Sequence, residues 1–270
     1  MCVLIYRRAP HAADVTPPLR GEPHMVQHGE KPCAFQGEDR SENTFSPPEE
    51  IPPVPRQADR SPEFDCPATA PADQITTALD WMKSFLTTPH PDIGRKGAVC
   101  PFVEPAMRGR TLHIQHRRLP PDAAPAHISA LVEDMVHTFA TARWNHPNKT
   151  LHALVTVIDG LPPHRTTVLD DAHPLIKPSL VRRRLMLGQF HPTCPETAAR
   201  NPDFPVSQSP VPLLALRHMA FHDILFLHHD PAYFTAYAQT YGHRYRRSTI
   251  PDPHFTDLYT RACRTWDITP

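Results

Sequence analysis

The chain of 270 residues carries 28 basic and 28 acidic side chains, 19 His, 35 Pro and only 9 Gly. So few Gly exclude collagen and Gly-rich linker proteins, and no apolar run approaches the ~18 residues that a membrane-spanning helix needs. A formal net charge of zero argues against a protein that works mainly by neutralising nucleic-acid phosphates, so we expect neither a nucleic-acid nor a membrane partner.

The N-terminal part, residues 1–72, shows no helical or strand periodicity and is interrupted by repeated Pro pairs. Such a segment cannot bury enough apolar surface to offset the entropy lost on ordering it. We therefore predict a disordered, Pro-rich segment over residues 1–72 and an ordered domain over residues 73–270. The alternative interpretation of the segment is a Pro-rich ligand for a partner domain.

Apolar periodicity predicts the elements of the ordered domain. In chain order they are a helix over 73–86, a loop over 90–109, a strand over 111–116, a helix over 126–144, a strand over 151–158, a helix over 175–184, strands over 185–190 and 212–219, and helices over 230–242 and 255–266. The two adjacent late strands favour a mixed or antiparallel sheet of about four strands with helices on one side. The fold class is therefore a single α+β domain.

The cysteines and the N-terminus bear on the compartment. The six Cys are scattered, with no Cys-x-x-Cys pair, which argues against a disulfide framework and against a structural zinc site of the usual kind. The apolar stretch near the N-terminus is too short for a signal peptide, and its charge lies on the wrong side. These features predict a cytoplasmic protein with reduced thiols.

Several motifs of common enzyme classes are missing from the sequence. There is no Gly-x-x-x-x-Gly-Lys, Gly-x-Gly-x-x-Gly, Gly-x-Ser-x-Gly or His-Glu-x-x-His run. Their absence argues against P-loop NTPases, Rossmann dehydrogenases, α/β-hydrolases and zincins.

The first group of candidate residues lies in the run from Gly94 to Phe102, where two Gly bracket two cations. Arg95 and Lys96 are suited to bind a carboxylate or a propionate, and Cys100 to act as a nucleophile or thiolate ligand. The alternative is a surface loop whose Cys packs into the core as a small hydrophobe.

Two further candidates follow predicted strands. His191 leaves the end of the 185–190 strand before Pro192, a position typical of ligands and catalytic groups. Arg217, at the end of the last strand, is a candidate anion anchor. His218 could chelate a metal with His222 if the segment were helical, but the preceding residues favour a strand.

Three runs resemble an uncharacterised bacterial family, a domain of unknown function often met near natural-product genes. They are Gly-Arg-Lys-Gly-Ala-Val-Cys-Pro-Phe at 94–102, Leu-Gly-Gln-Phe-His-Pro at 187–192 and Ser-Pro-Val-Pro-Leu-Leu-Ala-Leu-Arg-His-Met at 209–219. The resemblance covers about residues 81–245, which is most of the predicted ordered domain.

The layout is also distantly similar to the YqcI/YcgG-like proteins, which include haem-dependent N-hydroxylases of guanidine or amino-acid substrates. Cys100-Pro101, His191-Pro192, Arg200 and the 211–216 strand stand at the matching places, whereas Thr193-Cys194-Pro195 departs from that pattern. This resemblance implies haem with His191 as its axial ligand. Arg95, Lys96, Arg217 and His218 would then hold the haem or a substrate carrying a carboxylate.

The leading hypothesis from the sequence is therefore a haem-dependent oxygenase-like protein that oxygenates a nitrogen of an amino-acid-like or guanidine substrate. A second hypothesis is a cofactor-free enzyme or binding module that grips an anionic small molecule, with Cys100 or His191 in nucleophilic or acid–base work. A third is a non-catalytic accessory protein of a biosynthetic assembly.

Overall fold

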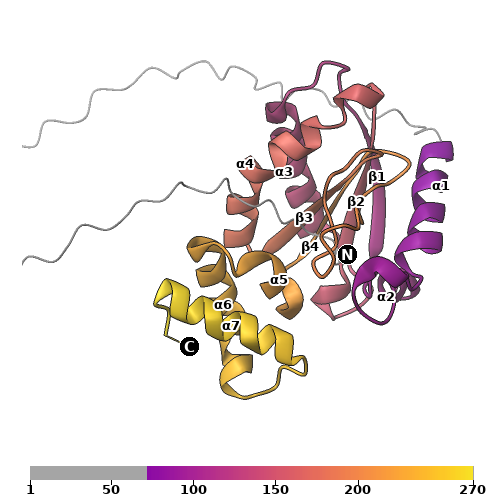
Figure 1. Ribbon diagram of the computed structural model, residues 1–270. Helices are drawn as coiled ribbons and strands as arrows, with labels where there is room; N and C mark the ends of the chain where they lie inside the picture. The colour runs from indigo at the N-terminus through magenta and orange to yellow at the C-terminus, as the bar shows by residue number, and fades with distance from the viewer. Residues whose placement is uncertain (1–71, 270) are drawn as a thin grey trace, which may run out of the picture. The chain divides into compact units, whose positions relative to one another are not determined.

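The computed structural model describes residues 72–269 (Figure 1), so the predictions for the Pro-rich segment lie outside the described residues. Within this range the chain forms an α+β domain around one four-stranded sheet, which confirms the predicted fold class. None of its helices combines the length and apolar character required to cross a membrane.

The sheet contains the four predicted strands, with ends that differ from the prediction by at most two residues. They are β1 (Leu112–Arg118), β2 (Ala153–Asp159), β3 (Leu185–Phe190) and β4 (Leu213–His218). Their order is β1-β2-β4-β3, with β1 and β2 parallel and β4 antiparallel to both β2 and β3. The sheet is therefore mixed.

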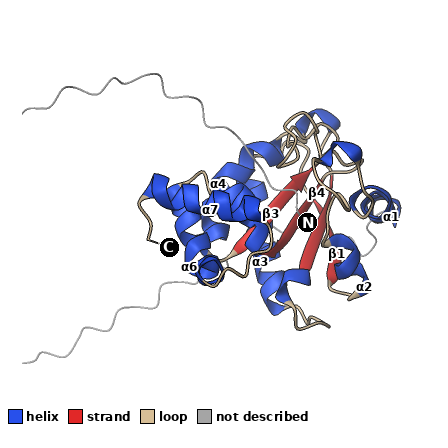
Figure 2. Ribbon diagram, turned by 60° about the horizontal axis from the view of Figure 1, so that its bottom comes forward, coloured by secondary structure: helices blue, strands red, loops and turns tan. Residues whose placement is uncertain are grey.

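Helices cover both faces of the sheet, so the prediction of helices on one side was wrong (Figure 2). Successive side chains of a strand point to opposite faces. In β2, Leu154 and Ile158 pack with one layer of helices, while Val155 and Val157 pack with the other. An apolar run without alternation is what a strand buried on both faces requires.

One layer consists of α3 (Pro125–Thr141) and α4 (Val168–Arg182). We predicted that the second of these helices begins at residue 175, directly after Pro174, a residue type that is unfavourable inside a helix. The helix begins seven residues earlier and contains both Pro. Pro174 is exposed and Pro178 is half-buried, so neither ring disturbs the apolar face that α4 packs on the sheet.

The other layer consists of α1 (Ala72–Trp81), a π-helical turn over Met82–Leu86, and α2 (Val103–Arg108). We predicted one helix over 73–86, and the chain changes to the wider turn after Trp81. The short α2 lies in the segment predicted as a loop. It has only six residues, too few for a helical periodicity to be read from the sequence.

A third apolar group joins the end of the sheet to α5 (Ile224–Leu227), α6 (Pro231–Arg246) and α7 (Pro253–Trp266). The Asp230 side chain accepts a hydrogen bond from the Tyr233 N–H, which confirms the predicted helix start. The helix does not end at Gly242 as predicted. A Cβ at this position would lie 2.8 Å from the Tyr259 hydroxyl oxygen, so Gly242 serves the close packing of α6 on α7.

Candidate functional site

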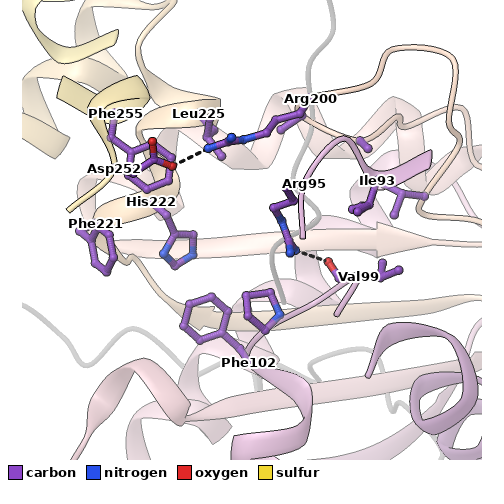
Figure 3. Close-up of a pocket in the computed structure, with 14 residues that line it drawn as sticks. Ile93, Arg95, Val99, Phe102, Arg200, Phe221, His222, Leu225, Asp252 and Phe255 are labelled. Carbon is purple, nitrogen blue, oxygen red and sulfur yellow. Dashed lines mark hydrogen bonds and ion pairs between the residues drawn. The ribbon is translucent and has the colours of Figure 1, made fainter. Parts of the chain in front are cut away.

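A cavity of about 360 Å³ lies among the loop before α2, the loop that follows β3, and the helices α5 and α7 (Figure 3). Its wall is mainly apolar. The larger apolar side chains are those of Ile93, Val99, Phe102, Phe221, Leu225 and Phe255, and the charged or polar ones are those of Arg95, Arg200, His222 and Asp252. An apolar wall with a few convergent polar groups is typical of a small-molecule site.

The loop before α2 places Arg95 at the cavity. Gly94, just before it, has φ +74°, and a Cβ there would lie 2.9 Å from both Cβ and the carbonyl oxygen of Arg200. Only Gly fits this left-handed, close-packed turn. The Arg95 guanidinium then donates to the carbonyl oxygens of Lys96 (3.1 Å) and Val99 (2.8 Å), which fixes its position.

Arg95 keeps hydrogen-bonding capacity for a ligand. A guanidinium has five N–H donors, and only two are used in these backbone contacts. Among residues 72–269, Arg95 makes no ion pair. Its positive charge is therefore not neutralised by a carboxylate of the described domain.

The second arginine of the cavity is held differently. Arg200 Nη2 lies 2.6 Å from Asp252 Oδ2, and its guanidinium carbon lies 5.9 Å from the centre of the Phe255 ring. Asp252 also caps α7, because its Oδ1 accepts from the His254 N–H. The Arg200–Asp252 pair is electrically neutral, so the net charge at the wall comes from Arg95.

His222 supplies a neutral polar group to the wall. Its ring stacks on Phe102 with centroids 4.5 Å apart, and burial lowers its pKa to about 4. Nε2 lies 3.8 Å from Asp223 Oδ1, beyond hydrogen-bond distance, and has no hydrogen-bond partner among the described residues. In Figure 3 the His222 ring and the Arg95 guanidinium extend into the same space.

Acidification is expected to lower the free energy of unfolding. Burial lowers the pKa of His222 and of His218 to about 4, against 6.5 for an ordinary His, so the unfolded chain binds more protons between these values. Stability therefore falls as the pH drops from about 6.5 towards about 4. Urea unfolding at about pH 7.5 and about pH 5 measures the loss.

The control is His222→Phe, whose ring can still stack on Phe102 but does not titrate. The difference in stability between the two pH values should be smaller in this variant. An equal difference in both proteins would contradict the contribution assigned to His222.

Of the residues predicted in the first candidate run, the structure brings only Arg95 to the cavity. Lys96 is exposed and does not line it. Cys100 is fully buried in the apolar layer formed by α1 and α2 against the sheet. Its surroundings match the alternative interpretation of this Cys as a small core hydrophobe.

His191 lies away from this cavity. Its side chain is fully buried, with Nε2 3.0 Å from Asp170 Oδ2 and Nδ1 3.2 Å from the Thr166 hydroxyl. Both ring nitrogens face protein side chains, and His191 does not line the cavity described above. The surroundings do not fit a haem, which needs an open face at its axial ligand. Haem binding stays a prediction without structural support.

The last two candidates, Arg217 and His218, are also used within the fold. The Arg217 guanidinium makes a bidentate ion pair with Asp223, and only 3% of Arg217 is exposed. His218 packs edge-on against the Phe139 ring, with centroids 4.9 Å apart. It ends β4, so it does not share a helical face with His222. Their roles in ligand binding stay predictions, and these contacts do not support them.

Sequence reasoning missed most partners of Arg95 in the cavity. Asp252 and Phe255 belong to the start of α7, and nothing in their own segment signals a site. Arg200 was noted only through the family resemblance. Sequence reasoning also missed Asp170 and Cys194, which lie next to His191. For Cys194 the sequence held a signal, because His191 and Cys194 have the His-x-x-Cys spacing of two metal ligands.

Comparison with known proteins gives one match. A family model described as Domain of unknown function (DUF6875) matches residues 75–251. No curated protein and no solved structure matches the chain. Arg95, Arg200 and His222 fall inside the matched region, whereas Asp252 and Phe255 follow it directly.

Proposed function

The chain belongs to this family of domains of unknown function, and we propose that its cavity binds a small organic monoanion, a carboxylate on an apolar or aromatic body. The observation that carries the proposal is Arg95. It is a guanidinium with three uncommitted N–H donors and no carboxylate partner in the described domain, set in a mainly apolar wall. This function corresponds to the binding module for an anionic small molecule that the sequence offered as an alternative.

The chemistry of the wall supports a carboxylate. A guanidinium can hold a carboxylate through two parallel hydrogen bonds, which fixes the orientation of the ligand. With the Arg200–Asp252 pair neutral and His222 uncharged at neutral pH, the wall carries a single net positive charge. One negative charge on the ligand balances it.

The size of the cavity and its aromatic lining support a ligand with an apolar body. A volume of about 360 Å³ lies at the lower end of the range for small-molecule sites. Phe102, Phe221 and Phe255 offer ring faces and edges for stacking with a flat ligand. His222 can add one hydrogen bond to a polar substituent, since Nε2 has no partner in the described domain.

A matched set of ligands tests the proposal. Aryl and branched alkyl carboxylic acids are compared by calorimetry with their uncharged primary amides, which have nearly the same shape. The acids should bind and the amides should bind at least about 10-fold more weakly, because they lose the charge-assisted hydrogen bonds.

Arg95→Met should weaken binding of the acids by about 10- to 100-fold, the loss expected for one charged hydrogen-bonded pair. Lys96→Met is the control, because it removes a neighbouring cation that does not line the cavity. Equal binding of acids and amides would contradict the proposal. So would a loss in Lys96→Met as large as that in Arg95→Met.

A further inference from the structure

A second group of polar side chains lies where β3 meets the first turn of α4. His191 follows β3, Asp170 is the third residue of α4, and Cys194 lies in the loop beyond. His191 and Cys194 are fully buried, and only 5% of Asp170 is exposed. One nitrogen, one carboxylate oxygen and one sulfur all lie within 4.8 Å of one another. Three kinds of metal-ligating atom thus converge in the interior.

The ligand atoms, all within 4.8 Å of one another, are nearly as close as the ligands of one metal ion. Nε2 of His191 lies 3.0 Å from one oxygen of Asp170, Oδ2, and Sγ of Cys194 lies 3.8 Å from the other oxygen, Oδ1. Tetrahedral zinc, with bonds of about 2.0–2.3 Å, places its ligand atoms roughly 3.3–3.6 Å apart. The observed distances lie on both sides of that range.

Both ring nitrogens of His191 have polar neighbours. Nδ1 lies 3.2 Å from the Thr166 hydroxyl and 3.3 Å from the Thr193 hydroxyl, and Nε2 lies 3.0 Å from Asp170 Oδ2. The Thr166 hydroxyl donates to the Pro163 carbonyl at 3.0 Å, so it can accept a hydrogen bond from His191 Nδ1–H. A His with its proton on Nδ1 presents the Nε2 lone pair to a metal ion, and the hydroxyl fixes the orientation of its ring.

Neighbouring polar groups hold the three candidate ligands in place. Gln189 Nε2 donates to Asp170 Oδ1 at 3.3 Å, which orients the carboxylate, as the Thr166 hydroxyl orients the imidazole. Gln189 Oε1 is buried and has no hydrogen-bond partner in the described domain. Asp170 and Gln189 also line a small cavity of about 120 Å³, which can supply a water ligand.

We propose that His191 Nε2, an Asp170 carboxylate oxygen and Cys194 Sγ bind one Zn²⁺ ion, with a water from the adjacent cavity as the fourth ligand. Nitrogen, sulfur and carboxylate ligands together are typical of zinc, and three protein ligands with one water are typical of a catalytic rather than a structural site. The site is separate from the anion cavity and does not depend on the function proposed for it.

Cobalt titration of the full-length, reduced and metal-stripped protein tests the site. One equivalent of Co²⁺ should produce a thiolate-to-cobalt charge-transfer band and the visible bands of tetrahedral cobalt, and Zn²⁺ should abolish both. Cys194→Ser should lose the charge-transfer band. Cys263→Ser, which changes a buried thiol of α7, should retain it.

Two results overturn the proposal: no charge-transfer band in the unmodified protein, or a band that persists in Cys194→Ser. Either result leaves the contact between His191 and Asp170 as a hydrogen bond of the folded domain. The first result needs no variant, so it stands even if Cys194→Ser does not fold. Thr166→Val, which keeps all three ligands, should weaken Zn²⁺ binding by about 10- to 100-fold.

Discussion

Replacing Asp223 with alanine is expected to lower the free energy of unfolding by about 3–5 kcal/mol, because it leaves a buried guanidinium without its carboxylate. Arg217 Nη1 and Nη2 lie 2.7 and 2.5 Å from the two Asp223 oxygens, and the exposed fractions of the two residues are 3% and 0%. Asp223 also accepts a hydrogen bond from the Ala220 N–H at 2.7 Å. The substitution removes all three hydrogen bonds at once.

The pH dependence of this contribution has a definite sign. Burial opposes ionisation of Asp223, but the Arg217 guanidinium outweighs it and holds the pKa of the carboxyl below its ordinary value of 3.8. A lowered pKa stabilises the folded state above about pH 3.8, and this stabilisation is lost as the pH falls through the folded-state pKa. The substitution should therefore have its full effect at neutral pH, measured by urea unfolding.

Two controls separate the ion pair from other effects of the substitution. Asp257→Ala removes an exposed carboxylate of α7 and should change the stability by less than about 0.5 kcal/mol. The double variant Arg217→Met/Asp223→Leu should recover most of the loss, because it leaves no uncompensated charge in the interior. A loss below about 1 kcal/mol in Asp223→Ala would contradict the account.

The sequence predicted those parts of the fold whose signal is local. The four strands were found because each is a short apolar or alternating run that ends at a turn signal, such as Asp159-Gly160 after β2. Helix ends were harder to predict. The start of α4 was predicted after Pro174, although the helix contains this Pro. Gly242 suggested an end where α6 continues, because packing on α7 overrides the local preference.

The candidate site was predicted only in part, because its residues come from four segments distant in the sequence. Two Gly around two cations signalled the loop that carries Arg95, but the pattern could not separate Arg95 from Lys96. That distinction depends on which of the two side chains the folded loop directs into the cavity. The side chains of α7 that complete the wall join the site only through the tertiary fold.

The same limit applies to residues that the sequence singled out for chemistry. Arg217 was expected to bind an anion, and the anion that it contacts is Asp223 of its own chain. His191 was expected to bind a metal, and its position at the end of β3 does place it among metal-ligating atoms. The end of a predicted strand thus indicated where polar groups converge. The partner of each group, however, depends on the elements that pack against the strand.

Gly160→Ala is expected to lower the free energy of unfolding by about 2–5 kcal/mol, the combined cost of a left-handed backbone and of overpacking. Gly160 has φ +88°, and a Cβ there would lie 2.1 Å from the Leu119 carbonyl oxygen, where the chain leaving β1 passes the end of β2. Gly97→Ala is the matched control. Its φ is +94°, but the nearest atom to its Cβ is 3.7 Å away.

The two glycines share the same left-handed backbone conformation. Gly97→Ala should therefore lower the free energy of unfolding by only about 1–2 kcal/mol, which is the backbone strain alone. The difference between the two variants in urea unfolding then measures the contact with the Leu119 carbonyl. That carbonyl belongs to backbone, and the neighbouring Leu119 N–H donates to the Asp159 carbonyl at 2.9 Å, so it cannot move without breaking the parallel pair at its end. An equal loss of unfolding free energy in both variants would contradict this account. It would show that the backbone at Leu119 moves to accept the new Cβ, and that Gly160 is needed only for its backbone angle.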